Sequence, residues 1–222
     1  MAAVEKIPLL KSVPLFSGLD DGELHTLFDH ASVRSFPKNS VIINDGDESD
    51  SLYVIASGKV KIFLMDDKGK EIILNFQSTG EYFGELSLLD QVCRSASVIT
   101  LEPCQFIVIS RAAFMQCISQ HPEVALRVIR DLTARLRGLT DEIKGFALLD
   151  VYGRLSRILL KLAEPRDGEL VIERAPPRKD LASMVGSSRE MVTRIMKALE
   201  EGGHITVNGK TIVIHGQLPY AW

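Results

Sequence analysis

The spacing of apolar residues changes along the chain, and each change predicts a different kind of structure. Residues 33–110 contain short runs rich in Val, Ile and Phe, separated by turn sequences such as Asn44-Asp45-Gly46-Asp47. Strands are predicted at residues 41–43, 51–55, 60–64, 71–76, 96–101 and 105–109. Several short strands at this spacing indicate an antiparallel barrel or roll. A helix over residues 20–30 is expected before the roll, and residues 84–89 predict a single helical turn within it.

Residues 121–147 have a helical pattern whose apolar positions are alternately four and three residues apart. These positions are Ala125, Ile129, Leu132, Leu136, Leu139, Ile143 and Phe146. An average period of 3.5 residues is typical of a coiled-coil seam and favours a partner helix. The pattern therefore predicts a parallel homodimer, although an amphipathic helix packed on its own domain would have a similar one.

The last third of the chain predicts helices at residues 151–163, 178–185 and 188–201, with a strand at 170–173. A hairpin over residues 204–214 follows, because Asn208-Gly209 between two β-branched runs is a strong hairpin signal. Two helices joined by Gly186-Ser187 and followed by a hairpin indicate a winged helix-turn-helix. The fold class is therefore α+β, with a roll domain at 1–118, a dimerisation helix and hinge at 119–149, and a DNA-binding domain at 150–222.

The second helix of this motif separates into an apolar and a polar face. Val192, Ile195, Met196 and Leu199 form the apolar stripe. The polar face consists of Arg189, Glu190, Thr193, Arg194 and Lys197. Arginine can bind guanine O6 and N7, and glutamate can accept from cytosine N4, so this face suits reading of G·C pairs in a major groove. A solvated helix face would explain any one of these residues alone.

Three further residues complete the predicted DNA interface. Ser188 can cap the helix or donate to a phosphate. Lys179 and Lys210 can supply phosphate contacts, although each taken singly also fits a solvated charge. Charge supports this interface: residues 1–150 hold 15 Lys and Arg against 21 Asp and Glu, whereas residues 151–222 hold 11 against 8. A basic rear part indicates contact with a polyanion.

Composition excludes several other classes of protein. With 45% hydrophobic and 25% charged residues the chain is an ordinary globular one, and no apolar run approaches the length of a membrane span. The first residues lack an apolar segment of signal-peptide type, so a cytoplasmic location is expected. Cys93, Cys104 and Cys117 are an odd number at wide spacing, which predicts reduced thiols packed as small buried hydrophobes.

The chain lacks the signatures of metal, haem and enzyme chemistry. No cysteine precedes position 93, which argues against an iron–sulfur cluster, and no zinc spacing occurs. His25 and His30 fit exposed helix positions better than haem ligands. No catalytic motif such as G-x-S-x-G, H-E-x-x-H or a Walker loop is present, and the predicted domains leave no room for a catalytic one, so an enzyme is not expected.

Three motifs give the chain a resemblance to the cyclic-AMP receptor / fumarate–nitrate regulator (CRP/FNR) family of bacterial transcription factors. They are LDVYGRL at 149–155, VGSSREMVTR at 185–194 and GKTIV at 209–213, which match that family's hinge, recognition helix and wing. The resemblance implies that Arg189, Glu190 and Arg194 read a TGTGA-like half-site. It also implies a two-fold dimer on a near-palindromic DNA site and contact with RNA polymerase.

A second pair of motifs, FGELSLL at 83–89 and RSASV at 94–98, is similar to the phosphate-binding cassette of cyclic-nucleotide domains. The implied ligand residues are Gly84, Glu85, Leu86, Ser87, Arg94 and Ser95. Glycine lets the backbone approach a ligand, glutamate can accept from a ribose hydroxyl, and arginine can bind a cyclic phosphate. The alternative is a Glu85–Arg94 salt bridge that merely closes a turn.

The identity of the effector stays open at this point. Leu139 and Thr140 occupy the positions from which the family's dimer helix reaches adenine, and a leucine cannot hydrogen-bond a base. Cyclic AMP, cyclic GMP and cyclic di-GMP all remain candidates. We expect the effector to change the pose of the DNA-binding domains about a hinge near residues 145–150. A ligand-independent DNA-binding regulator is the alternative.

Overall fold

The computed structural model describes residues 7–48, 50–166, 168–216 and 218. Their contacts divide the chain into two compact units. The N-terminal unit comprises residues 1–68 and 74–135, and the C-terminal unit comprises residues 69–73 and 136–222.

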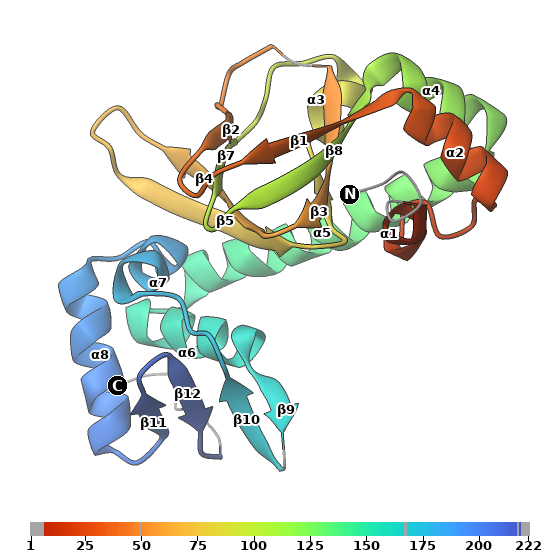
Figure 1. Ribbon diagram of the computed structural model, residues 1–222. Coiled ribbons are helices and arrows are strands. Elements are labelled where there is room, and N and C mark those ends of the chain that lie inside the picture. Colours follow the sequence, from red (N-terminus) through yellow and green to blue (C-terminus); the bar gives the residue numbers. More distant parts are fainter. Residues whose placement is uncertain (1–6, 49, 167, 217, 219–222) are drawn as a thin grey trace. The chain divides into compact units, whose positions relative to one another are not determined.

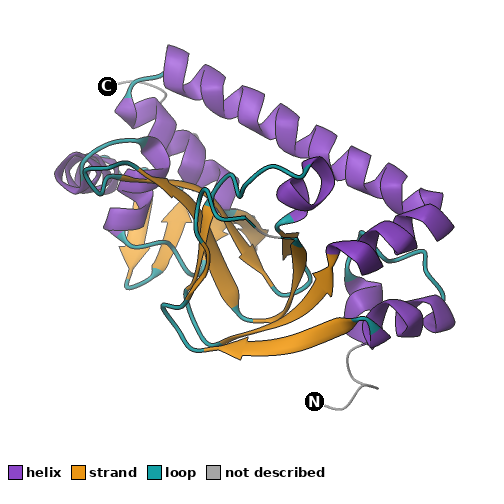
Figure 2. Ribbon diagram, turned by 90° about the horizontal axis from the view of Figure 1, so that it is seen from above, coloured by secondary structure: helices purple, strands orange, loops and turns teal. Residues whose placement is uncertain are grey.

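Among the described residues, eight strands form the roll of the N-terminal part, and Figure 1 shows their course. They are β1 (Ala31–Phe36), β2 (Val41–Ile43), β3 (Ser51–Ser57), β4 (Lys59–Met65), β5 (Glu71–Ser78), β6 (Tyr82–Phe83), β7 (Ser97–Thr100) and β8 (Cys104–Ser110). One sheet has the order β1-β8-β3-β6 and the other β2-β7-β4-β5. The pairs β1–β8, β3–β8 and β4–β7 are antiparallel. Figure 2 shows these strands curving over one another, which confirms the predicted antiparallel roll.

An aromatic cluster fills the interior of the roll. Phe106 is fully buried, and its ring centroid lies 5.5 Å from that of Phe83, 5.7 Å from Phe36 and 6.1 Å from Tyr53. Alternation along β3 and β8 directs such residues inward, because successive side chains of a strand point to opposite faces.

The helices of the N-terminal part are α1 (Ile7–Ser12), α2 (Asp21–Asp29), α3 (Glu85–Asp90), α4 (Arg111–Gln120) and α5 (Pro122–Leu148). A capping box begins α2: Asp20 accepts from the backbone N–H of Glu23, and the Glu23 carboxylate accepts from that of Asp20. The first 14 residues of α5 belong to the N-terminal unit and the rest to the C-terminal unit.

The C-terminal unit contains α6 (Val151–Leu162), α7 (Arg178–Val185), α8 (Arg189–Glu201) and the strands β9 (Glu164–Arg166), β10 (Glu169–Ile172), β11 (Ile205–Asn208) and β12 (Thr211–Ile214). The strands form one sheet in the order β11-β12-β10-β9. The apolar stripe of α8 is buried in the core of this unit, as predicted. Gly186 ends α7 with a φ of +64°, a value that glycine adopts at little cost. These elements confirm the winged helix-turn-helix.

Sequence patterns missed several elements. The strands β1, β6 and β9 and the helices α1 and α4 were not predicted. The expectation that all three cysteines are buried was wrong for Cys93, which is exposed, whereas Cys104 and Cys117 are buried. Cys93 lies in the loop between α3 and β7, where no packed layer covers it. Within the described ranges, no helix is long and apolar enough to cross a membrane.

Truncation of the central ring of the roll, Phe106→Ala, should lower the free energy of unfolding by about 3–5 kcal/mol, since it leaves a large cavity. Urea unfolding followed by circular dichroism measures this loss. The control Met65→Ala removes a side chain that is 61% exposed and should change stability by less than about 1 kcal/mol. Equal losses for the two variants would contradict the assignment of Phe106 to the core.

Candidate ligand-binding and DNA-binding sites

Gly84 and Arg94 form the centre of the predicted phosphate-binding cassette. Gly84 precedes α3 with a φ of +89°. Arg94 is 4% exposed, and its guanidinium donates to the carbonyl oxygens of Gly84 and Ser51, both at 2.7 Å. A Cβ atom added at Gly84 would lie 2.4 Å from Nη1 of Arg94. The arginine therefore keeps this position only because residue 84 has no side chain.

Glu85, the next residue, is also buried, with 4% of its surface exposed. Its Oε1 lies 2.8 Å from Nη1 of Arg135 on α5. Burial raises the pKa of Glu85, and the charge of Arg135 partly offsets this effect. The Glu85–Arg94 salt bridge considered above is thus replaced by an ion pair that joins α3 to the long helix.

Arg135 belongs to a small network that the sequence did not reveal. Its Nη2 lies 2.9 Å from Oδ2 of Asp131, one turn earlier on α5, and the Tyr82 hydroxyl donates to the same Asp131 oxygen. Burial opposes the charge on Arg135, yet Glu85 and Asp131 outweigh it and raise the pKa of Arg135. Burial and the bond to Asp131 raise the pKa of Tyr82. The spacing of four residues between Asp131 and Arg135 could have indicated their ion pair from the sequence. Only the fold brings Glu85 and Tyr82 to this pair.

The remaining predicted ligand residues differ in exposure. Ser87 is buried, and its hydroxyl has no hydrogen-bond partner among the described residues. Leu86 and Ser95 are exposed. Leu139 and Thr140 are exposed positions of α5 within the C-terminal unit, where the Thr140 hydroxyl donates to the carbonyl of Leu136 at 3.0 Å. Their part in a ligand site stays a prediction.

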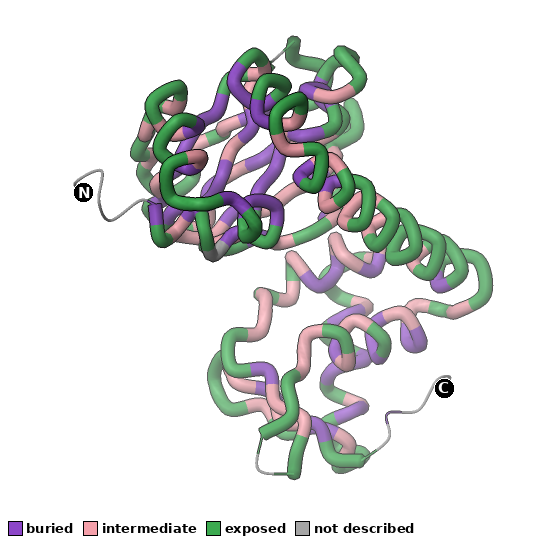
Figure 3. Tube along the Cα trace, turned by 90° about the vertical axis from the view of Figure 1, so that its right-hand side faces the viewer, coloured by how far each residue is buried: buried purple, intermediate pink, exposed green. Residues whose placement is uncertain are grey.

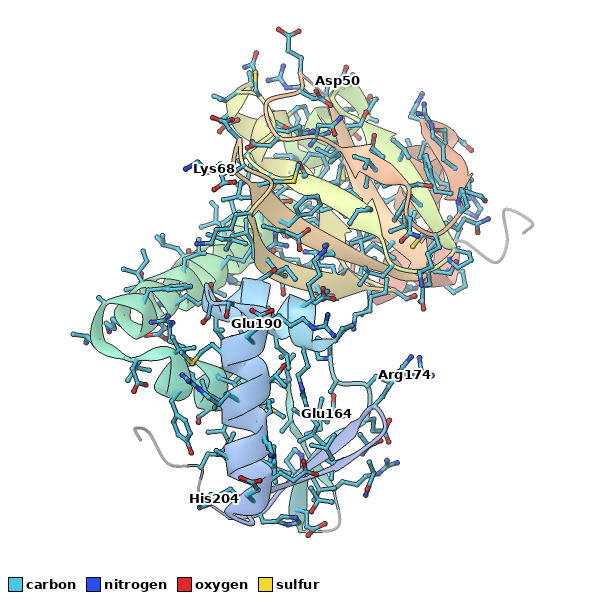
Figure 4. The ribbon with its side chains drawn as sticks, turned by 90° about the vertical axis from the view of Figure 1, so that its left-hand side faces the viewer. Asp50, Lys68, Glu164, Arg174, Glu190 and His204 are labelled. Carbon is cyan, nitrogen blue, oxygen red and sulfur yellow. The ribbon has the colours of Figure 1, made fainter. Side chains whose placement is uncertain are left out.

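The polar face of α8 is exposed as predicted. Ser188 caps the helix by accepting from the backbone N–H of Met191 at 3.2 Å. All five predicted residues of this face are exposed, namely Arg189, Glu190, Thr193, Arg194 and Lys197. Figure 4 shows Glu190 at the start of α8 and His204 just beyond its end. The arginine side chains are therefore on the face that can enter a groove, where Nη2 of Arg194 donates to Sδ of Met191 at 3.0 Å. The Thr193 hydroxyl donates to the carbonyl of Arg189.

Lys179 and Lys210 extend the basic face beyond α8. Both are exposed, Lys179 at the start of α7 and Lys210 in the turn between β11 and β12. Burial lowers the pKa of the neighbouring Arg178. The turn is tied to the loop between β10 and α7, since the Lys210 carbonyl accepts from the backbone N–H of Ala175 at 2.8 Å.

The end of α5 is fastened to the helix-turn-helix. Nε of Arg154 donates to the carbonyl of Val185 at 2.9 Å, and its Nη1 donates to that of Leu149 at 2.8 Å. The same guanidinium lies 5.2 Å from the centre of the Phe146 ring. A Cβ atom at Gly186 would be 3.0 Å from that ring. Sequence reasoning did not single out Arg154 for this role.

The predicted seam of α5 is largely uncovered. Exposed fractions are 58% for Ile129, 64% for Leu136, 49% for Leu139, 67% for Ile143 and 46% for Phe146. Leu132 packs partly against the core of the roll, and Ala125 is half-buried. Figure 3 shows most of α5 in the exposed colour. A row of large apolar side chains of this kind marks an interaction surface.

Comparison with known proteins assigns both parts of the chain. Residues 33–121 match the cyclic nucleotide-binding domain and residues 153–216 match the Crp-like helix-turn-helix domain. The cAMP-activated global transcriptional regulator CRP of Pasteurella multocida is 34% identical over 204 residues, covering 88% of this chain and 96% of the relative. The cAMP-activated global transcriptional regulator Vfr of Pseudomonas aeruginosa is 34% identical over 223 residues, covering 97% and 99%.

Among solved structures, the c-di-GMP responsive global regulator CLP of Xanthomonas campestris has a TM-score of 0.75 and 28% identity, covering 89% of this chain and all of that one. A cyclic nucleotide-binding domain followed by a helix-turn-helix defines a class of transcription regulators. The chain belongs to the CRP/FNR family of these regulators.

The pairing of Arg135 with Glu85 predicts a pH-dependent loss of stability in Arg135→Gln. Without Arg135 the raised pKa of Glu85 rises further, so the folded state holds its proton to higher pH than the unfolded chain does. A raised folded-state pKa gives stability that is present at low pH and lost as pH rises. The variant should therefore be destabilised relative to the natural protein by about 2 kcal/mol more at pH 7.5 than at pH 5.

Urea unfolding at the two pH values tests this difference. Adding Glu85→Gln to the Arg135→Gln variant should remove the difference, because the titrating group is then absent. The same penalty at both pH values in the single variant would mean that Arg135 does not compensate the charge of Glu85.

Proposed function

We propose that this regulator is a homodimer that binds a near-palindromic DNA site, and that a cyclic nucleotide held by the cassette controls this binding. The observation that carries the proposal is the cassette around Gly84, where Glu85, Ser87 and Arg94 are all buried, the Arg94 guanidinium donates to the Gly84 carbonyl, and the Ser87 hydroxyl has no partner in the described chain. Buried charges are costly unless they are paired or serve a ligand.

Arg189, Glu190 and Arg194 are the proposed base-reading residues. All three are exposed on the first two turns of α8, the part of a recognition helix that enters the major groove. Arginine on guanine and glutamate on cytosine suit the G·C pairs of a TGTGA-like half-site. Lys179, Lys197 and Lys210 would contact phosphates, with Ser188 and Thr193 at the edge of the interface.

The proposed nucleotide-binding residues are Gly84, Glu85, Leu86, Ser87, Arg94 and Ser95. When bound, the nucleotide supplies a phosphodiester anion and a ribose hydroxyl. Arg94 is a guanidinium already held in place, so it can bind the anion with little loss of side-chain freedom. Ser87 offers a buried hydroxyl with no partner in the described chain, and Glu85 can accept from the ribose.

Control of DNA binding would pass through Arg135. A ribose hydroxyl that donates to the Glu85 carboxylate would share its negative charge with Arg135, so a ligand on Glu85 would weaken the tie between α3 and α5. The far part of α5 moves with the helix-turn-helix, because Arg154 and Phe146 fasten it there. These contacts favour a joint N-terminal to the hinge expected at residues 145–150, close to the boundary between Arg135 and Leu136. Linkage of this type is usually worth about 1–3 kcal/mol.

Cyclic AMP is the proposed effector, supported by the 34% identity to cAMP-activated relatives. Cyclic di-GMP is the alternative, favoured by Leu139, which cannot hydrogen-bond adenine, and by the likeness to the c-di-GMP responsive CLP. A regulator that needs no ligand is the third outcome of the test below.

The proposal includes a functional division into residues 1–118, 119–149 and 150–222. RNA polymerase is the proposed further partner, and the cytoplasm the proposed location, since a transcription regulator works on chromosomal DNA. The proposed function involves no metal, haem or iron–sulfur cluster and no catalytic activity.

Fluorescence anisotropy of a labelled TGTGA palindrome tests this function. DNA binding is measured without ligand, with cyclic AMP and with cyclic di-GMP. One nucleotide should tighten or weaken DNA binding by about 5–150-fold. Arg94→Ala should abolish that response, whereas Arg194→Ala should keep nucleotide binding and lower the preference for TGTGA over a substituted site by about 1–3 kcal/mol. Arg34→Ala, at an exposed position of β1, is the control.

The outcomes separate the alternatives. Specific DNA binding without any nucleotide effect would indicate the ligand-independent regulator. A nucleotide response that survives Arg94→Ala, together with one lost in Arg194→Ala, would reject the assignment of the two sites.

The apolar seam predicts that Leu136→Asp and Ile143→Asp shift the protein from dimer to monomer, because each places a carboxylate in the proposed helix–helix interface. Sedimentation velocity measures the mass of the particle. Leu148→Asp is the matched control, since Leu148 is 78% exposed but lies outside the seam. A natural protein that sediments as a monomer at all concentrations would overturn the dimer.

A further inference from the structure

A recess lies in the N-terminal unit beside the cassette, and one of its lining residues, Arg135, pairs with Glu85. Its volume is about 490 Å³, and its wall comes from the N-terminal segment, the turn before β6 and the first half of α5. The lining residues are Pro14, Leu15, Gly80, Glu81, Tyr82, Arg127, Arg130, Asp131 and Arg135. None of the proposed nucleotide-binding residues is among them. A recess of this size is in the range of small-molecule sites.

The wall carries three guanidinium groups and two carboxylates, and both carboxylates are already engaged. Asp131 pairs with Arg135 and accepts from the Tyr82 hydroxyl. Glu81 accepts from the backbone N–H of Ser78 at 2.7 Å and from its hydroxyl at 3.1 Å. Within the described part of the chain, neither Arg127 nor Arg130 has a carboxylate oxygen within 4.0 Å. The recess therefore has an excess of positive charge.

Arg127 is held in an unusual position. A Cβ atom at Gly18 would lie 2.0 Å from its Nη2 and 2.6 Å from its Nη1, so the guanidinium occupies space that only a glycine at position 18 leaves free. Its Nη1 is buried and has no acceptor in the described chain. A buried N–H of a charged group without an acceptor is destabilising, and an anion beside it removes much of that cost.

We propose that this recess binds a small phosphorylated molecule with at least two negative charges. Arg127 and Arg130 would hold the phosphate groups, since guanidinium groups match phosphate oxygens in pairs. Pro14 and Leu15 offer an apolar wall to the rest of the ligand. Inorganic polyphosphates and organic phosphate esters share the charged part of this chemistry.

Isothermal titration calorimetry of the full-length protein with sodium pyrophosphate tests the site, with sodium chloride at matched ionic strength as the blank. A second titration with fructose 1,6-bisphosphate distinguishes an organic ester from an inorganic anion. We expect saturable binding at one ligand per chain for at least one of them. The Arg127→Gln/Arg130→Gln variant should weaken that binding at least tenfold, and Arg34→Gln should leave it unchanged.

Gly18→Ala is the sharper variant, because it keeps every charge and only displaces the Arg127 guanidinium. It should weaken binding by a similar factor, while its circular dichroism melt stays near that of the natural protein. Saturable binding unaffected by Gly18→Ala, or by the double variant, would overturn the proposal. The proposal would also be overturned if neither pyrophosphate nor fructose 1,6-bisphosphate bound the natural protein.

The variant Arg94→Ala separates this site from the cassette. Arg94→Ala should no longer bind cyclic nucleotide but should still bind the phosphate ligand. The Arg127→Gln/Arg130→Gln variant should still bind cyclic nucleotide and should bind the phosphate ligand more weakly. Loss of the phosphate ligand in Arg94→Ala would place that ligand in the cassette and reject the recess. A failure of cyclic nucleotides to bind the natural protein would count against the proposed function alone.

Discussion

The ion pair between Glu85 and Arg135 is the interaction on which the proposed regulation depends. Glu85 is nearly inaccessible to solvent, so its charge needs a partner, and the partner comes from the long helix rather than from the roll. A ligand hydroxyl that donates to the same carboxylate would draw on the negative charge that pairs with Arg135. In the proposed regulation, burial would thereby connect a local binding event to the position of a helix, because neither charge can be left alone at low cost.

The two ends of α5 are attached in different ways. Near its start the helix contributes Val124 and Val128 to the core of the roll. Near its end Phe146 lies against Gly186, the residue that turns α7 into α8, and Arg154 bonds to the carbonyl just before that glycine. Movement of the last turns of α5 would thus carry the recognition helix with it. The apolar seam between these ends is free to meet a second copy.

Arg135 and Asp131 also line the proposed phosphate recess. An anion there would attract Arg135 and reduce its hold on Glu85, so the two proposed ligands would affect each other through one guanidinium. Such coupling is reciprocal by thermodynamic necessity. The coupling between the two ligands depends on the proposed nucleotide site, whereas the proposed phosphate recess depends only on Arg127, Arg130 and Gly18.

Much of this protein could be predicted from local pattern. Periodicity of two and of 3.6 residues, together with turn residues such as Asn208-Gly209, located most strands and helices, the apolar stripe of α8 and the cassette motif. Local pattern missed β1 and α4, and it placed Cys93 in the interior. The sequence alone determined which residues are exposed on α8 and which apolar positions repeat along α5, because both follow from helix geometry. Only the tertiary structure decided that Glu85 pairs with Arg135, that Tyr82 reaches Asp131, and that Arg127 rests on Gly18, since those contacts join residues 49 to 109 positions apart.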